Sequence, residues 1–226
     1  FLGVDLESFD GDEPAVVELK RFKPSDPETT QRLANLKGPR IELDATSETI
    51  DVSGAGALLV HDNTTERSQA DEKEDDGLFE SGARGSTLFE WEESLAFARP
   101  QGLATMRGRV RVLHRAAGAS EVTQLECETL EALLSEPPEG VEGEPSLVRV
   151  DATDAVYAKH GPVEIVADVM TFLAPSERII ARAKENNRVT IRDEDEGRHI
   201  SADAVSLDVR SGDWTIEDVD PVTSTE

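Results

Sequence analysis

Cysteine, aromatic residues and long apolar runs are all scarce in this chain of 226 residues. The single cysteine, Cys127, excludes an intrachain disulfide, and we expect its side chain to be buried as a small hydrophobe. No apolar run reaches the roughly 18 residues that a membrane-spanning helix needs, so the sequence excludes one. Aromatic residues make up 4% of the chain, which favours a thin two-layered sheet over a large compact core.

Basic residues are few beside the acidic ones. The chain has 48 Asp and Glu against 23 Lys and Arg, which gives a formal net charge of −25. Such a charge repels DNA, RNA and anionic membrane surfaces, so the sequence predicts no nucleic-acid partner. The same self-repulsion protects a β protein with many sheet edges against aggregation.

Residues that would carry catalysis show no pattern in this sequence. The four histidines, His61, His114, His160 and His199, each lie at or near the end of an expected strand, without metal-ligand spacing. Cys127 has no base near it in the sequence, and no glycine-rich loop precedes an expected helix. We therefore predict a non-enzymatic protein with no catalytic residues, no metal and no cofactor.

Apolar and polar residues alternate along most of the chain, in short segments separated by turn residues. A period of two is typical of half-buried strands, so the sequence predicts an all-β fold of antiparallel strands with an apolar interior. Because the chain begins at Phe1 rather than Met, we expect a processed product or a fragment of a longer protein. The expected organisation is an N-terminal segment 1–40 with a strand at 15–19 and a short helix at 27–36, a β region 41–218 with an acidic loop 61–87 and a Pro/Gly-rich loop 135–146, and a tail 219–226.

Three segments repeat one pattern at intervals of about 35 to 40 residues, which is typical of a repeating β architecture. They are 125–132, 165–172 and 200–207, and each carries an acidic residue near its centre. Across this acid the apolar residues are three apart instead of two, as from Cys127 to Leu130. A bulge residue inserted at the acid returns both apolar residues to the interior and bends the strand. We therefore predict that each copy turns a corner and that the strands stack into a curled sheet.

Several stretches resemble the OstA-like family, the β-jellyroll domains of the lipopolysaccharide-transport bridge. The family motif is A-x-G-N-V-x-I-x-D, then a turn with G, then I-x-A-D-x-L-x-Y-D. The segments similar to it are 183–193 with 197–208, 104–113 with 125–134 and, more faintly, 54–62. One departure is Asn186-Asn187-Arg188-Val189, which stands where the family often has Gly-Asn-Val. The resemblance covers residues 100–218 and, weakly, 41–62.

The resemblance implies a curled β-jellyroll in the periplasm or cell envelope, with a V-shaped groove that holds acyl chains. It also implies protein partners stacked end to end through open sheet edges. Apolar faces with few large rings leave room for flexible chains, which agrees with a groove for a lipid or glycolipid. The residues that we expect to contact the lipid are Val110, Val112, Met170, Phe172, Val189, Ile191, Val205 and Leu207.

Two alternatives to the binding or passage of lipid stay open. One is a structural or adhesive β-repeat scaffold whose interior is a filled core. The other is a carbohydrate-active β-solenoid enzyme, which needs two carboxylates facing each other in a cleft. Five arginines also have two interpretations, as phosphate ligands at the groove mouth or as outward-facing partners of neighbouring acids. These are Arg107, Arg109, Arg111, Arg188 and Arg192.

Overall fold

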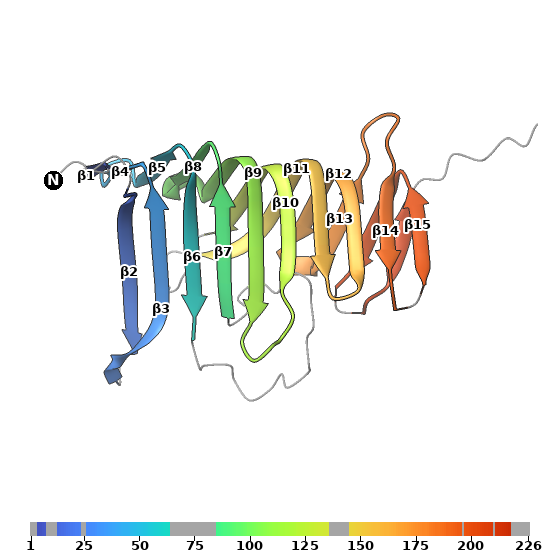
Figure 1. Cartoon of the computed structure of the whole chain (residues 1–226), viewed down its shortest axis with the longest axis horizontal. Coiled ribbons are helices and arrows are strands. Elements are labelled where there is room, and N and C mark those ends of the chain that lie inside the picture. Colours follow the sequence, from blue (N-terminus) through green and yellow to red (C-terminus); the bar gives the residue numbers. More distant parts are fainter. Residues whose placement is uncertain are drawn as a thin grey trace, which may run out of the picture.

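The computed structural model describes residues 4–7, 13–23, 26–63, 85–135, 145–195, 197–209 and 211–217. These residues form one antiparallel sheet of 17 strands, which confirms the predicted all-β fold. The sheet curls over on itself without closing (Figure 1). Among the described residues, no helix is long and apolar enough to cross a bilayer. The elements are β1 (Val4–Glu7), β2 (Ala15–Lys23), β3 (Asp26–Gly38), β4 (Arg40–Asp44), β5 (Thr49–Ser53), β6 (Gly56–Asp62), β7 (Gly85–Trp91), β8 (Ser94–Ala98), β9 (Leu103–Ala116), β10 (Thr123–Ser135), β11 (Ser146–His160), β12 (Val163–Leu173), β13 (Arg178–Arg182), β14 (Val189–Asp193), β15 (Arg198–Ala202), β16 (Ala204–Asp208) and β17 (Trp214–Glu217), with the 3-10 turns η1 (Arg99–Gln101) and η2 (Ala174–Ser176).

Four long central strands, β9 to β12, run through both layers of the curled sheet and join them. On one side of their bends they belong to a first layer, which also contains β2, β3, β6, β7, β14 and β15. On the other side they belong to a second layer, which also contains β1, β4, β5, β8, β13, β16 and β17. Figure 1 shows β2, β3, β6 and β7 of the first layer side by side.

Each central strand bends where it passes from one layer to the other. The bends lie at Gly108–Arg109 in β9, Glu128 in β10, Asp154–Ala155 in β11 and Asp168 in β12. The pairing register shifts at these positions, and the bend residues of β9 and β11 have positive φ. Shorter strands break at the same level, as β7 and β8 do on either side of Glu92–Glu93. We call this row of bends and breaks the corner line.

The apolar core lies between the layers and is deepest along the corner line. The bulges predicted at Glu128 and Asp168 are confirmed by the register shifts, whereas at Asp203 the chain breaks between β15 and β16. The apolar residues before and after each acid are all buried in this core, as predicted: Cys127 and Leu130, Ala167 and Met170, Ala202 and Val205. The burial expected for the cysteine is also confirmed, and it raises the pKa of the Cys127 thiol to about 12. The corners therefore keep apolar residues inward on both sides of each bend.

Inward side chains form rows that run across the strands, because paired strands in register place equivalent residues side by side. We number these rows outward from the corner line within each layer. On the first-layer part of β9, Val110 lies in row one, Val112 in row two and His114 in row three. On the second-layer part of the same strand, Met106 lies in row one and Ala104 in row two.

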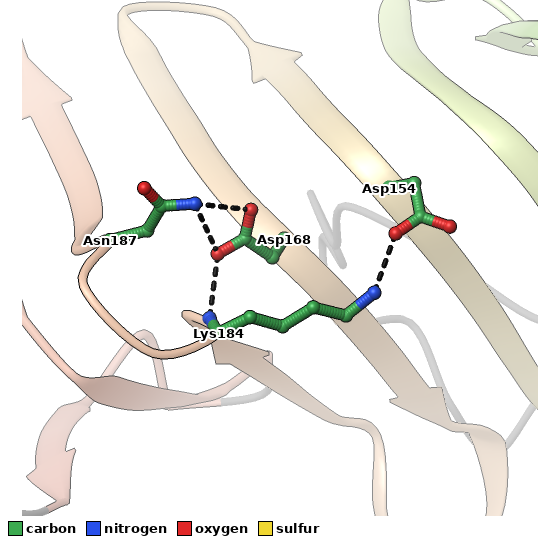
Figure 2. A network of polar contacts seen from close by, with 4 residues as sticks. All are labelled: Asp154, Asp168, Lys184 and Asn187. Atoms are coloured by element: carbon green, nitrogen blue, oxygen red, sulfur yellow. Dashed lines mark hydrogen bonds and ion pairs between the residues drawn. The ribbon is translucent and has the colours of Figure 1, made fainter.

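Polar contacts occupy the outer side of the corner line near β12 (Figure 2). Asp168 at the β12 bend accepts a hydrogen bond from the backbone N–H of Lys184 at 2.6 Å and another from the Asn187 amide at 2.9 Å. These bonds, the backbone one first, hold the pKa of Asp168 below its usual range. The Lys184 ammonium reaches Asp154 of the β11 bend at 2.5 Å. The acid of this corner thus satisfies the backbone of the connection between β13 and β14.

The short helix predicted near 27–36 is wrong, because these residues belong to strand β3. β3 pairs with β2 on one side and with β6 on the other, so its backbone groups are hydrogen-bonded on both edges. Ala34 and Leu36 share one face of this strand, and Leu36 is buried in the core. An isolated helix of about ten residues is marginal in water, so pairing on two sides outweighs the capping signal at its start.

The predicted segment boundaries also change. β1 pairs with β4 and β3 pairs with β6, so residues before 41 belong to the same sheet as those after it. Both ends of the predicted acidic loop lie in strands, because β6 ends at Asp62 and β7 begins at Gly85. The rest of that loop, most of the predicted loop 135–146 and the predicted tail 219–226 lie outside the described residues.

Candidate functional site

A cavity lies between the two layers, on the open side away from the corner line. Its volume is about 190 Å³, and most of the side chains around it are apolar. The first layer contributes residues of β7, β9 and β10, and the second layer contributes residues of β10 and β11. The lining residues are Thr87, Phe89, Val112, His114, Thr123, Leu125, Leu130, Ala132, Leu147 and Val150.

Strand β10 supplies both walls of the cavity because it bends at Glu128. Leu125, before the bend, pairs with Val112 in row two of the first layer. Ala132, after the bend, lies in row two of the second layer between Ala104 and Val150. Two adjacent alanines and a valine leave this part of row two thin, so the facing walls do not meet. The cavity therefore follows from small residues placed at the centre of one layer.

The eight residues predicted to contact a lipid all lie inside the curled sheet, in rows one and two. Val112 is the most exposed of them, at 8%. It lines the cavity, whereas Ile191 lines a much smaller one beside Trp214. The other six pack within the filled core: Val110, Met170, Phe172, Val189, Val205 and Leu207. Contact of these eight residues with a lipid stays a prediction.

Sequence reasoning missed the polar residues at the cavity mouth. In row three of the first layer, Thr87 and Thr123 flank His114 on the neighbouring strands β7 and β10. Thr87 Oγ1 lies 2.9 Å from Nδ1 of His114, and Thr123 Oγ1 lies 2.8 Å from Nδ1 of His160 on β11. Thr123 is a buried polar residue, so its hydroxyl depends on this partner. Two hydroxyl–imidazole pairs thus stand side by side at the mouth.

Ion pairs lie on both sides of this polar group, beyond Val60 on β6 and Val163 on β12. Toward the C-terminal end, row three passes from His160 to the apolar Val163 and then to Asp193, whose carboxylate lies 3.7 Å from Arg198. Toward the N-terminal end, one row further out, Arg32 Nε lies 2.6 Å from Asp62 Oδ2. We call these residues together the polar lip: Arg32, Asp62, Thr87, His114, Thr123, His160, Asp193 and Arg198.

The wall that faces the polar lip is apolar. Row two of the second layer carries an apolar side chain on every strand that it crosses, from β4 to β17. Its residues are Leu43, Ile50, Phe97, Ala104, Ala132, Val150, Phe172, Ile179, Leu207 and Trp214. We call this row the apolar wall. The open side of the molecule therefore presents one border rich in polar side chains, interrupted by Val60 and Val163, and one apolar border.

Three of the five arginines singled out in the sequence pair with acids on the outer surface. Arg109 Nε donates to Glu92 at 2.7 Å. Arg111 lies 3.8 Å from Glu90 and 3.7 Å from Glu126, and Arg188 lies 2.5 Å from Asp203. These contacts favour outward ion pairs over phosphate binding at the mouth. Within the described ranges, no group of three or more His, Cys, Asp or Glu could hold a metal ion.

Comparisons with known proteins return one structural likeness of low similarity. No family model matches the chain, and no curated protein matches it. A solved structure similar to it is LptH from Pseudomonas aeruginosa, described as the LptA homologous periplasmic component of a lipopolysaccharide transport device. The two share 15% identity with a TM-score of 0.44, over 62% of this chain and 89% of that one. At these values the likeness carries no conclusion about what this chain does.

Proposed function

We propose that this chain binds a lipid without transforming it, by taking an acyl chain into the cavity between the layers. The observation that carries the proposal is the cavity of about 190 Å³ with its apolar lining. An apolar cavity of about 150 Å³ is large enough to bind benzene, so this one has room for a segment of an acyl chain. Each Å² of apolar surface removed from water contributes about 25 cal/mol, which drives the chain inward.

The place of action and the partners belong to the same proposal. The OstA-like stretch at 183–208 supports a role in the periplasm or cell envelope, where such a protein passes lipid or glycolipid onward. Open sheet edges support end-to-end contact with other proteins. Among the described residues, β2 pairs with β3 alone at one end, and β15 pairs with β14 alone at the other. Both edges offer unpaired backbone groups that a further strand would satisfy.

A scaffold role is the second candidate, and the filled core favours it. Rows one and two are tightly buried on β12, β13 and β14, as the exposures of Ile165, Ile179 and Val189 show, none above 1%. A protein with this interior alone would hold no ligand. The third candidate, a carbohydrate-active enzyme, finds less support, because the residues that line the described cavity include no carboxylate.

Filling the cavity separates lipid binding from scaffolding. The proposed variant is Ala132→Phe, which places a ring in the thin part of the apolar wall. Its control is Ala96→Phe, the same change at an exposed residue of β8 that faces outward. The ligands are three lipids with one dodecyl chain each, namely 1-monolauroylglycerol, lauryl phosphate and dodecyltrimethylammonium, titrated calorimetrically below their micelle concentrations.

We expect the wild type and Ala96→Phe to bind at least one of the three lipids with equal affinity. Ala132→Phe should lose that binding by about tenfold or more, the equivalent of about 1.4 kcal/mol. Thermal melts of all three proteins would check that the variants remain folded. Binding that survives Ala132→Phe would place the lipid elsewhere, and no binding by the wild type would leave the scaffold as the function.

A further inference from the structure

The charges of the polar lip balance one another. Arg32 is matched by Asp62 at 2.6 Å, and Arg198 is matched by Asp193 at 3.7 Å. Asp62 and Asp193 are only 13% and 16% exposed, so both acids lie close against the sheet. The lip therefore offers no excess of positive charge, which an anionic headgroup such as a phosphate would require.

The field of the rest of the protein also disfavours an anionic ligand. The whole chain carries a net charge of −25, and Arg109, Arg111 and Arg188 are engaged by acids on the outer surface. We therefore expect a negative potential at a cavity mouth without excess cations. An anionic lipid would approach it against this potential, whereas an uncharged lipid would not be affected.

Between the two ion pairs, the lip presents groups that hydrogen-bond to neutral partners. Thr87, His114 and Thr123 all line the cavity, and their hydroxyl and imidazole groups can both donate and accept. The Thr87–His114 and Thr123–His160 bonds, at 2.9 and 2.8 Å, hold the rings in place beside the mouth. A hydroxyl group needs this mixture of donors and acceptors, whereas a carboxylate or phosphate needs donors only.

We propose that the lipid bound in the cavity has an uncharged headgroup that carries hydroxyl groups, such as a glycerol or a sugar. The acyl chain lies against the apolar wall, and the headgroup hydroxyls bond to Thr87, His114 and Thr123 at the polar lip. This inference rests on the proposed lipid binding and adds the chemical class of the ligand to it. The polar lip then selects the ligand, because the cavity itself would accept a dodecyl chain with any headgroup.

The three dodecyl lipids test this inference separately from lipid binding itself. The titrations are made at about 1 M salt, where the Debye length is about 3 Å, so that the surface charge does not attract or repel the ligands. We expect 1-monolauroylglycerol to bind at least about tenfold more tightly than lauryl phosphate or dodecyltrimethylammonium, a difference of about 1.4 kcal/mol. Equal affinities, or tighter binding of either charged lipid, would contradict the proposed uncharged headgroup. They would still agree with lipid binding in the cavity. Failure of all three to bind would overturn the proposed function.

Removal of one lip hydroxyl gives a second readout. Thr123→Val keeps the shape of the side chain and removes its hydroxyl, while Thr190→Val makes the same change on the outward face of β14. We expect Thr123→Val to weaken 1-monolauroylglycerol about tenfold, or about 1.4 kcal/mol, and to leave lauryl phosphate unchanged. Thr190→Val should change neither. If Thr123→Val melts at a low temperature, Thr87→Val serves in its place. Equally weakened binding of both lipids would refute a role of the lip hydroxyl in headgroup choice.

Discussion

The two long sides of the curled sheet are built in opposite ways. Along the corner line, bends such as Gly108–Arg109 and Asp168 bring the layers together over fully buried residues. On the open side, half-buried Thr87 and His114 stand across a cavity from Ala132 and Val150. We therefore expect the closed side to determine whether the chain folds, and the open side to bind the proposed ligand. Variants on the two sides should separate stability from binding.

The largest loss of stability should come from a charge in the deep rows. Ile191→Asp places a carboxylate in row two, where Ile191 is 2% exposed. We expect it to lower the free energy of unfolding by about 3 kcal/mol or more. Thr190→Asp, on the opposite face of the same strand, should change it by less than about 0.5 kcal/mol. Urea denaturation measures both, and equal losses would contradict the assignment of the two faces.

A smaller loss should follow from a side chain at the β9 bend. Gly108 has a φ of +80°, and a Cβ there would lie 2.9 Å from the backbone nitrogen of Glu93. We expect Gly108→Ala to cost at least about 2 kcal/mol from backbone strain and this contact together. Gly118 has almost the same φ, +83°, with no atom within 4 Å of its Cβ position. Gly118→Ala should therefore show the strain alone, about 1 kcal/mol, in the same denaturation experiment.

The smallest loss should come from the acid of the β12 bend, and it should depend on pH. Asp168→Asn weakens the bonds to Lys184 N–H and Asn187, so we expect a lower denaturation midpoint at neutral pH. Asp154→Asn removes an exposed ion pair to the same lysine and should leave the midpoint unchanged. Figure 2 shows both acids around Lys184.

The sign of the pH effect follows from the lowered pKa of Asp168. Because the folded protein holds this proton less tightly than the unfolded chain, the carboxylate stabilises the fold above the unfolded pKa, near 3.9. That contribution disappears as the pH falls through the lower folded value. The wild type and Asp168→Asn should therefore converge in stability below about pH 4. A difference that persists in acid would mean that the charge of Asp168 is not what stabilises the bend.

Much of the fold could be predicted because the corners leave a mark in the sequence. Alternation alone indicates strands, and the three-residue step from Cys127 to Leu130 or from Ala167 to Met170 reveals a bulge. The pairing of strands far apart in the chain leaves no such mark. The sequence therefore predicts a helix within β3, because it does not show that β2 and β6 supply the backbone hydrogen bonds that make this segment a strand.

The candidate site was only half predictable, for a related reason. Hydrophobic alternation finds rows one and two, where all eight predicted residues lie. It stops at row three, because His114 and Thr123 look like the polar ends of strands. Their place could have been found from parity, since Val110, Val112 and His114 occupy every second position of one strand. The cavity itself depends on Ala104 and Ala132 lying side by side on the paired strands β9 and β10. Only the register of these two strands shows that they do.

The row arrangement also determines how this architecture can vary in size. A strand end on the open side can gain two residues, which adds one inward and one outward side chain and leaves every bend where it is. A single added residue would instead exchange the two faces of everything beyond it. The depth of the open side is therefore adjustable in steps of two residues at the tips of strands such as β7 and β9. A designer could deepen the space between the layers in this way without redesigning the corner.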